Sequence, residues 1–323
     1  RPLTKPSAGM PRGTAASADS PRAYPKTDSG RRILRSEPTA RLRGHPHHDM
    51  LLHRLITALV LLPLLLGLVW FAPTVWVYAV FVVVGALAAR EWAALCAWGR
   101  RPVAAQGYAA VVVVILVLAW LAPARSQWLP LLLVIAAVHW LAVFFWLRAG
   151  PARLAMLAAS PLSAPQGALL IVSTLLSAAT LHAQPDGALR LLFALFLVFA
   201  ADVGAYLAGR NLGRRKLAPA ISPGKTLEGA VGGVALCGLW ALTAGVWIFP
   251  VQGLQVVGLV VLCLLVAVAS VAGDLLESGY KRAAGVKDSG TLLPGHGGVL
   301  DRIDSVVAAI PLFTLGLMLM GLA

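Results

Sequence analysis

Charged residues are scarce in this chain of 323 residues. Asp, Glu, Lys and Arg together make up 12% of it, whereas hydrophobic residues make up 59%. Soluble globular domains contain about 25% charged residues and about 45–50% apolar ones. This imbalance excludes an ordinary soluble domain and predicts a protein that crosses a membrane several times.

Cysteine is also rare, with three residues in the whole chain. Cys96, Cys237 and Cys263 each stand alone in an apolar stretch, and no two of them form a Cys-x-x-Cys pair. This spacing excludes a disulfide framework and a zinc knuckle. We expect the three side chains to act as small hydrophobic groups in packed helices.

The first 49 residues lack any apolar run. They contain seven Pro, four Gly, ten Lys or Arg and four Asp or Glu. Such a segment cannot bury enough apolar surface to offset the entropy of ordering, so we expect residues 1–49 to form a disordered basic extension. Because Met50 directly precedes the first apolar stretch, we hypothesise that it is the physiological start, which intact-mass measurement would test. Residues 50–323 are expected to form a transmembrane catalytic domain.

Apolar runs of about 16 to 22 residues recur from Leu55 onward. A helix needs roughly 20 such residues to cross about 30 Å of hydrocarbon. We therefore predict an all-α, polytopic integral membrane protein with about nine transmembrane helices. The nine runs cover residues 55–72, 74–89, 106–122, 128–147, 165–183, 188–209, 229–248, 254–276 and 305–322.

Basic residues predict the orientation of these helices. The formal net charge is +14, which in a soluble protein would suggest a nucleic-acid partner. If the N-terminus is cytosolic, however, every Lys and Arg except Arg125 and Arg190 falls in a cytosolic segment. This asymmetry follows the positive-inside rule. We therefore expect a cytosolic N-terminus, a multi-pass protein of the cytoplasmic (inner) membrane, and no nucleic-acid partner.

Polar residues are unevenly distributed between the two halves of the body. Between Arg54 and Arg190 the only acidic residues are Glu91 and Asp186, and we interpret Arg90 and Glu91 as an interfacial ion pair. The second half carries three polar blocks between residues 201 and 305. In the first block, Asp202 lies inside a predicted span, where an ionisable group costs at least about 2.5–3.5 kcal/mol unless it faces a polar cavity. Further polar site candidates, on this and later helices, are Asp202, Tyr206, Glu228 and Glu277.

The second block is the basic loop of residues 210–225. Its cations are Arg210, Arg214, Arg215, Lys216 and Lys225. A P-loop is excluded, because Pro219 stands where that motif needs glycine and no buried strand precedes it. Ser222, Lys225 and Thr226 still predict an anion-binding surface; the alternative is that these cations only set the topology.

The third block, residues 273–305, holds the most specific pattern. Asp274, Glu277, Ser278 and Lys281 share one helix face, at i, i+3, i+4 and i+7. Asp301, Asp304 and Ser305 are likewise placed at i, i+3 and i+4, at the start of the last predicted span. Carboxylate ligands favour a hard cation such as Mg²⁺ over zinc. Helix capping and surface ion pairs could explain single residues of this block without any metal ion, but they do not explain the whole cluster.

Basic and glycine residues of this block suit phosphate groups. The cations that would neutralise phosphate charge are Lys281, Arg282, Lys287 and Arg302, and the glycines around His296 are Gly295, Gly297 and Gly298. Glycine lets the backbone approach a ligand closely. Together the three blocks predict a cytosol-facing site for phosphoryl or nucleotidyl transfer between a soluble nucleotide and a lipid phosphate.

Residues 278–304 resemble the signature of the phosphatidate cytidylyltransferases, or CDP-diacylglycerol synthases. The matching elements are Ser278, Lys281-Arg282, Lys287-Asp288, His296-Gly297-Gly298 and Asp301-Arg302-x-Asp304. The strings A-D-x-G-A-Y and S-P-G-K-T-x-E-G also resemble that family, so the similarity is sharp over residues 201–305. It continues as a loose hydropathy match from about Met50 to the end.

The resemblance implies that CTP and phosphatidate react to give CDP-diacylglycerol and pyrophosphate for phospholipid biosynthesis, with Mg²⁺ and a monovalent cation such as K⁺. It implies a metal centre at Asp274 and Asp301, which we expect Asp304 to support. The residues expected to act on the reacting phosphates are Lys281, Arg282, Lys287, Asp288, His296 and Arg302. Those expected to bind substrate phosphates are Ser222, Lys225, Thr226, Ser278, Gly297 and Gly298.

Two alternatives stay open at this point. One is another Mg²⁺-dependent lipid-headgroup enzyme, of the polyisoprenol or dolichol kinase type. The other is a cation-coupled transporter in which Asp202 binds the cation, although charges at the cytosolic rim do not favour it. The Gly229-x-x-x-Gly233 spacing permits a homodimer, and equally permits packing inside one chain.

Overall fold

A computed structural model describes residue 59, residues 62–292 and residues 297–322. The predicted basic extension, residues 1–49, lies outside the described residues. Met50 and His296 lie outside them as well, so the predictions made for these positions stay predictions.

Long apolar helices make up most of the described chain. Eight helical spans within the described ranges are long and apolar enough to cross a membrane. They are α2 (Thr74–Leu95), α3 (Pro102–Leu121), α4 (Arg125–Arg148), α6 (Ser163–His182), α7 (Gly187–Leu212), Leu227–Ile248, α10 (Leu254–Ala284) and Leu300–Leu319. The predicted all-α polytopic architecture is thus confirmed.

The predicted number of nine spans stays a prediction. Eight predicted apolar runs each correspond to one of these spans. The first run, residues 55–72, lies partly outside the described residues, and a shorter apolar helix, Leu62–Phe71, is described there. Two spans are composite. Leu227–Ile248 contains α8 (Leu227–Trp240), the π-turn η2 (Ala241–Gly245) and α9 (Val246–Ile248), and Leu300–Leu319 contains α11 (Leu300–Ile303) and α12 (Val306–Leu319).

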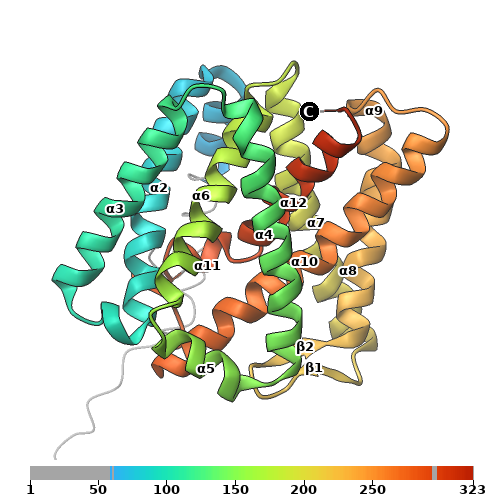
Figure 1. The fold of residues 1–323 in the computed structure, drawn as a ribbon. Helices are drawn as coiled ribbons and strands as arrows, with labels where there is room; N and C mark the ends of the chain where they lie inside the picture. The colour runs from blue at the N-terminus through green and yellow to red at the C-terminus, as the bar shows by residue number, and fades with distance from the viewer. Residues whose placement is uncertain (1–58, 60–61, 293–296, 323) are drawn as a thin grey trace, which may run out of the picture. The chain divides into compact units, whose positions relative to one another are not determined.

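A short β-hairpin separates α7 from α8. Strand β1 (Lys216–Ala218) pairs antiparallel with β2 (Ser222–Thr226), within the loop that the sequence predicted to be an anion-binding surface. Two other short elements connect spans: the 3₁₀ turn η1 (Ala97–Gly99) and helix α5 (Pro151–Ala159). In Figure 1, α5 and the hairpin lie at the same end of the bundle, opposite α9 and the C-terminus.

Glycine brings α7 and α8 into close contact. A Cβ added to Gly204 on α7 would lie 2.6 Å from the carbonyl oxygen of Gly232, and one added to Gly233 would lie 2.5 Å from that of Ala201. Side chains at these positions would therefore force the helices apart, as in other small-residue helix pairs. The glycine-rich face of α8 is used inside the chain, and the homodimer stays a prediction.

Helix α10 is the central element for the site. It packs against α4, α5, α7, α8 and α12, and its last turns reach the hairpin end of the bundle. It is longer than the predicted run 254–276, because polar turns through Ala284 continue the helix. Apart from Arg125 and Arg190, most Lys and Arg residues of the described ranges lie in or directly beside the connections α2–α3, α4–α6, α7–α8 and α10–α11, and α5 and the hairpin, which belong to two of these connections, lie at this end (Figure 1).

Candidate active site

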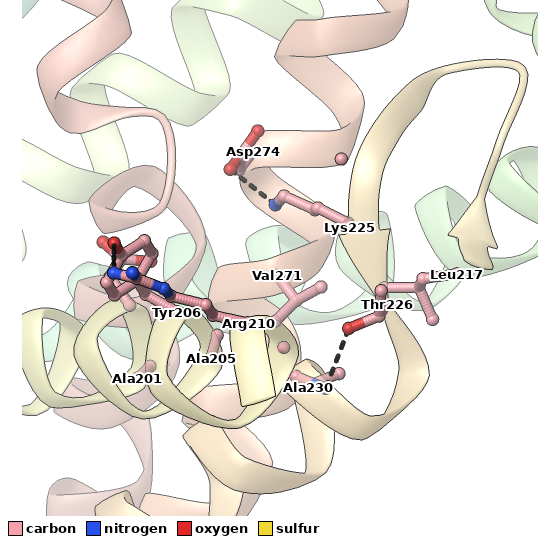
Figure 2. A pocket seen from close by; sticks show the side chains of 14 residues that line it. Ala201, Ala205, Tyr206, Arg210, Leu217, Lys225, Thr226, Ala230, Val271 and Asp274 are labelled. Carbon is pink, nitrogen blue, oxygen red and sulfur yellow. Dashed lines mark hydrogen bonds and ion pairs between the residues drawn. The ribbon is translucent and has the colours of Figure 1, made fainter. Parts of the chain in front are cut away.

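A cavity lined by several charged side chains, which we call the polar cavity, opens at the hairpin end of the bundle. It has a volume of about 390 Å³ and is lined by residues of α7, α8, α10 and the hairpin. Figure 2 shows these side chains around the cavity, with Lys225 directed toward Asp274. The polar and charged side chains that line it are Asp202, Tyr206, Arg210, Lys225, Thr226 and Asp274.

Asp274 binds two of the predicted phosphate-binding residues. Its Oδ2 lies 2.5 Å from Lys225 Nζ, and its Oδ1 accepts a hydrogen bond of 3.1 Å from Ser278 Oγ. The ion pair ties β2 to α10 across the cavity. The ammonium group and the carboxylate both lie at the cavity wall and are still partly exposed. The ammonium group can therefore bind an anionic ligand, and the carboxylate a cationic one.

Helix α7 contributes a polar face to the same cavity. Asp202, Tyr206 and Arg210 follow one another at intervals of four residues, so they share one side of the helix. Arg210 Nη1 donates a hydrogen bond of 3.0 Å to the hydroxyl of Tyr206, whose side chain is 61% exposed. Asp202 therefore lines a polar cavity together with Lys225 and Asp274, which explains how an ionisable group is accommodated on this helix.

Thr226 and Glu228 hold the hairpin in place. Thr226 Oγ1 accepts a 3.1 Å hydrogen bond from the backbone N–H of Gly229 and so caps α8. Glu228 accepts hydrogen bonds from the backbone N–H groups of Arg214 (3.0 Å) and Arg215 (3.1 Å) and forms an ion pair of 2.9 Å with the Arg215 side chain. Ser222 pairs with Ala218 in the hairpin ladder. These contacts fix the basic loop that carries Lys225.

A second charged cluster lies further along the same face of α10. Lys281 Nζ is 3.1 Å from Glu277 Oε2 and 2.7 Å from Asp301 Oδ1, and all three side chains are largely buried. The ammonium group thus neutralises one carboxylate of its own helix and one of α11. Lys281 was predicted to act on phosphates; in this structure it joins α10 to α11.

Asp301 also binds both described parts of the connection between these helices, residues 285–292 and 297–299; we call the connection, residues 285–299, the signature loop. Its Oδ2 accepts hydrogen bonds from the backbone N–H groups of Ser289 (2.9 Å) and Gly298 (2.8 Å). Gly297 has φ +81°, and an added Cβ would lie 2.6 Å from Asp301 Oδ2. Glycine is required there for both its backbone angle and its lack of a side chain.

Glu91 on α2 is the functional candidate that the sequence did not reveal. Its side chain is 4% exposed. Oε2 accepts hydrogen bonds from Ser289 Oγ (3.0 Å) and Leu300 N (2.8 Å), and Oε1 accepts one from Val299 N (3.1 Å). The predicted interfacial ion pair with Arg90 is therefore wrong. Glu91 instead holds the end of the signature loop and the start of α11, where free N–H groups favour a negative charge.

The remaining predicted residues of the described ranges lie on α10, on the signature loop and on α11. Arg282 Nε donates a long hydrogen bond of 3.4 Å to the carbonyl oxygen of Ile221 in the hairpin. Lys287 and Asp288 are exposed on the signature loop, and Arg302 is exposed on α11. The structure therefore brings α7, the hairpin, α10 and the signature loop together, with Glu91 behind the loop.

Comparison with known proteins identifies the family. The model of the cytidylyltransferase family matches residues 52–320. The chain belongs to this family. Over 265 residues it is 38% identical to the phosphatidate cytidylyltransferase of Pseudomonas aeruginosa, a match that covers 82% of this chain and 96% of that protein.

Shorter matches link the chain to two other members of the cytidylyltransferase family. It is 46% identical over 142 residues to the phosphatidate cytidylyltransferase of Haemophilus influenzae, covering 41% of this chain and 47% of that protein. It is 44% identical over 133 residues to that of Staphylococcus haemolyticus, covering 41% and 50%. The family membership predicted from residues 278–304 is thus confirmed.

The acidic residues of the site meet only part of what a metal centre requires. Among residues 62–292 and 297–322, no three His, Cys, Asp or Glu side chains are grouped so as to hold one ion. However, Glu277 Oε1 is buried without a hydrogen-bond donor, and it lies beside Asp304, whose Oδ1 accepts a 2.6 Å hydrogen bond from Ser305 N. Mg²⁺ at nucleotide sites takes one or two carboxylates and completes its shell with phosphate oxygens and water. Glu277 and Asp304 supply two carboxylates for such an ion. Asp301 could join them only through Oδ1, which already binds Lys281, because its Oδ2 accepts two hydrogen bonds from the signature loop.

Proposed function

We propose that this protein transfers the cytidylyl group of CTP to phosphatidate, giving CDP-diacylglycerol and pyrophosphate. The observation that carries the proposal is the match to nearly the full length of the Pseudomonas aeruginosa phosphatidate cytidylyltransferase. The polar cavity supports it, because charged groups converge at one end of an otherwise apolar bundle. A lipid phosphate and a soluble nucleotide can both reach that end.

The proposed reaction is an in-line displacement. An oxygen of the phosphatidate phosphate attacks the α-phosphorus of CTP, the bond from that phosphorus to the bridging oxygen breaks, and pyrophosphate leaves. The lipid phosphate is already anionic at neutral pH, so the attack needs no general base. Catalysis then rests on positioning two anions and stabilising the leaving charge.

Each part of the site has a proposed task. Lys225, with Ser222, Thr226 and Ser278, binds phosphate groups at the cavity wall, and Gly297 and Gly298 offer close backbone approach. The residues proposed to act at the reacting phosphates are Lys281, Arg282, Lys287, Asp288, His296 and Arg302, and the four cations among them would stabilise the leaving pyrophosphate or the lipid phosphate. Asp202, Tyr206, Glu228 and Glu277 shape and support this surface.

Metal ions have a proposed place beside these groups. Asp274 and Asp301, supported by Asp304, would hold Mg²⁺ together with the phosphates of CTP, and a monovalent cation such as K⁺ would assist. Bound Mg²⁺ supplies positive charge against the phosphate oxygens. We expect turnover to stop when Mg²⁺ is removed by a chelator and to return when it is restored.

We further propose that the protein lies in the cytoplasmic membrane with the hairpin end facing the cytosol. The concentration of Lys and Arg at that end supports this orientation. CTP would then reach the polar cavity from the cytosol, while phosphatidate arrives from the bilayer.

The substitution Asp301→Asn tests the proposed function. The variant keeps the size of the side chain but weakens its bonds to Lys281, Ser289 and Gly298, so we expect CTP:phosphatidate turnover to be lost in a protein that remains folded in detergent. Asp186→Asn, a change at the opposite end of the bundle, is the matched control and should leave turnover unchanged. Retained CTP-dependent activity in the Asp301 variant would refute the assignment. Turnover of a polyisoprenol in place of phosphatidate would instead favour the lipid-kinase alternative.

A further inference from the structure

A second, apolar hollow adjoins the polar cavity. Its volume is about 660 Å³, and it is lined by residues of α4, α8, α10 and the hairpin. Helices α4 and α8 each pack against α10, and the hairpin lies at the end of the bundle where these helices meet it (Figure 1). Leu147, Ile221, Val234, Val268 and Leu275 are typical of its lining, and among the described residues that line it Arg148 alone is charged.

The apolar hollow and the polar cavity share part of their walls. Leu217, Ala230 and Val271 line both, and Figure 2 shows these three side chains at the edge of the polar cavity. On one side of them lie Lys225 and Asp274. On the other side the surface is apolar. The small side chain of Ala230 leaves little bulk at this boundary.

This arrangement matches the two ends of one ligand. A phospholipid carries an anionic phosphate and, within a few bonds of it, two long apolar chains. An apolar groove next to a cationic cavity can bind both parts at once, since burial of a chain is favourable only where no polar group is left unpaired. Arg148, at the cytosolic end of α4, lies where a headgroup would be expected.

We propose that the groove lined by α4, α8 and α10 binds an acyl chain of the lipid substrate whose phosphate enters the polar cavity. The inference rests on the proposed function. An unspecific bilayer lipid could also fill an apolar groove, but it would not make turnover depend on the chain length of the substrate. Chain-length dependence therefore separates the two cases.

The experiment fills the groove and compares two substrates. Val231 on α8 lines the groove and is 62% exposed, so Val231→Trp adds bulk without disturbing the core. We expect kcat/KM for dipalmitoyl phosphatidate to fall by about fivefold or more, and kcat/KM for dihexanoyl phosphatidate to change by less than about twofold. Val261→Trp, an exposed position on α10 outside the groove, is the control and should change neither value.

Two outcomes would overturn the inference. If Val231→Trp lowers kcat/KM equally for both substrates, the groove has only a structural role, and if it lowers neither, the groove does not take the chain. A second measurement uses the unmodified protein and a phosphatidate that carries a photoreactive group in the part of one chain nearest the glycerol; cross-links should fall within residues 144–151 or 227–234, which line the groove. Absence of turnover by the unmodified protein on both lipids would overturn the proposed function itself, and would be seen before any variant is made.

Discussion

Glu91 offers the sharpest test of how the signature loop is held. The carboxylate lies on α2, yet its three hydrogen bonds come from Ser289, Val299 and Leu300, about 200 residues further along the chain. Ser289 connects it to the charged cluster, because the same residue donates its backbone N–H to Asp301. Glu91 is thus placed to act as a positioning residue for Asp301.

The substitution Glu91→Gln keeps the shape of the side chain and removes one acceptor. Either orientation of the amide points its NH₂ group at a backbone N–H, that of Val299 or that of Leu300. A buried donor left without an acceptor costs about 1–3 kcal/mol. If this free energy destabilises the loop conformation that the reaction requires, kcat should drop by roughly 5- to 150-fold, since about 1.4 kcal/mol corresponds to a factor of ten.

The assay measures kcat, KM and the melting temperature of the purified protein in detergent. We expect kcat to fall while KM for CTP changes little. Arg90→Gln, at the exposed neighbouring position, should leave kcat unchanged. Ser289→Ala should lower kcat in the unmodified protein and add little in the Glu91→Gln background, because the two residues act through one contact.

Three results would contradict this role of Glu91. One is a Glu91→Gln protein that is stably folded and has an unchanged kcat. Another is full additivity of the Glu91 and Ser289 changes, which would mean that Glu91 does not act through the loop. The third, a melting temperature lowered with no change in kcat, would show a purely structural role.

Two further predictions concern the loop and the topology. Gly298→Ala places a Cβ 2.3 Å from Glu91 Oε2, so we expect the free energy of unfolding to fall by about 1–3 kcal/mol and kcat to fall as well. Neither effect is expected for the control Gly107→Ala, where the added Cβ meets open space. A Gly298→Ala protein with unchanged stability and kcat would contradict the close packing. A cysteine introduced at Arg214 should react with an impermeant maleimide only from the cytosolic side, and one at Arg125 only from the other side. The three native cysteines are buried and should stay silent, while labelling of both positions from one side would contradict the topology.

The helices could be predicted because an apolar run inside a membrane can pair its backbone N–H and C=O groups only by forming a helix. The run 128–147 corresponds to α4, Arg125–Arg148. The end of α10 was missed by eight residues, because hydropathy marks where the chain leaves the hydrocarbon and not where the helix ends. The hairpin was missed because strands of three and five residues are too short to show an alternating pattern, and the longer strand contains Pro223 and Gly224.

The site could be predicted only in part. The shared face of Asp274, Ser278 and Lys281 follows from helix periodicity alone. The partners Lys225 and Asp301 belong to other elements, and periodicity within one helix does not pair residues across elements. Glu91 did leave a signal, since an acidic residue alone in an apolar half requires a polar partner, but the sequence does not say that this partner is the backbone of a distant loop.

The proposed site transfers a nucleotidyl group to a lipid phosphate. The most direct measurement incubates the purified protein with phosphatidate, Mg²⁺ and CTP labelled at either the α- or the γ-phosphorus. Cytidylyl transfer predicts that α-label enters the lipid fraction and that γ-label is released as pyrophosphate. Transfer of γ-label to the lipid would identify a kinase, and label in neither fraction from a folded protein would contradict the account.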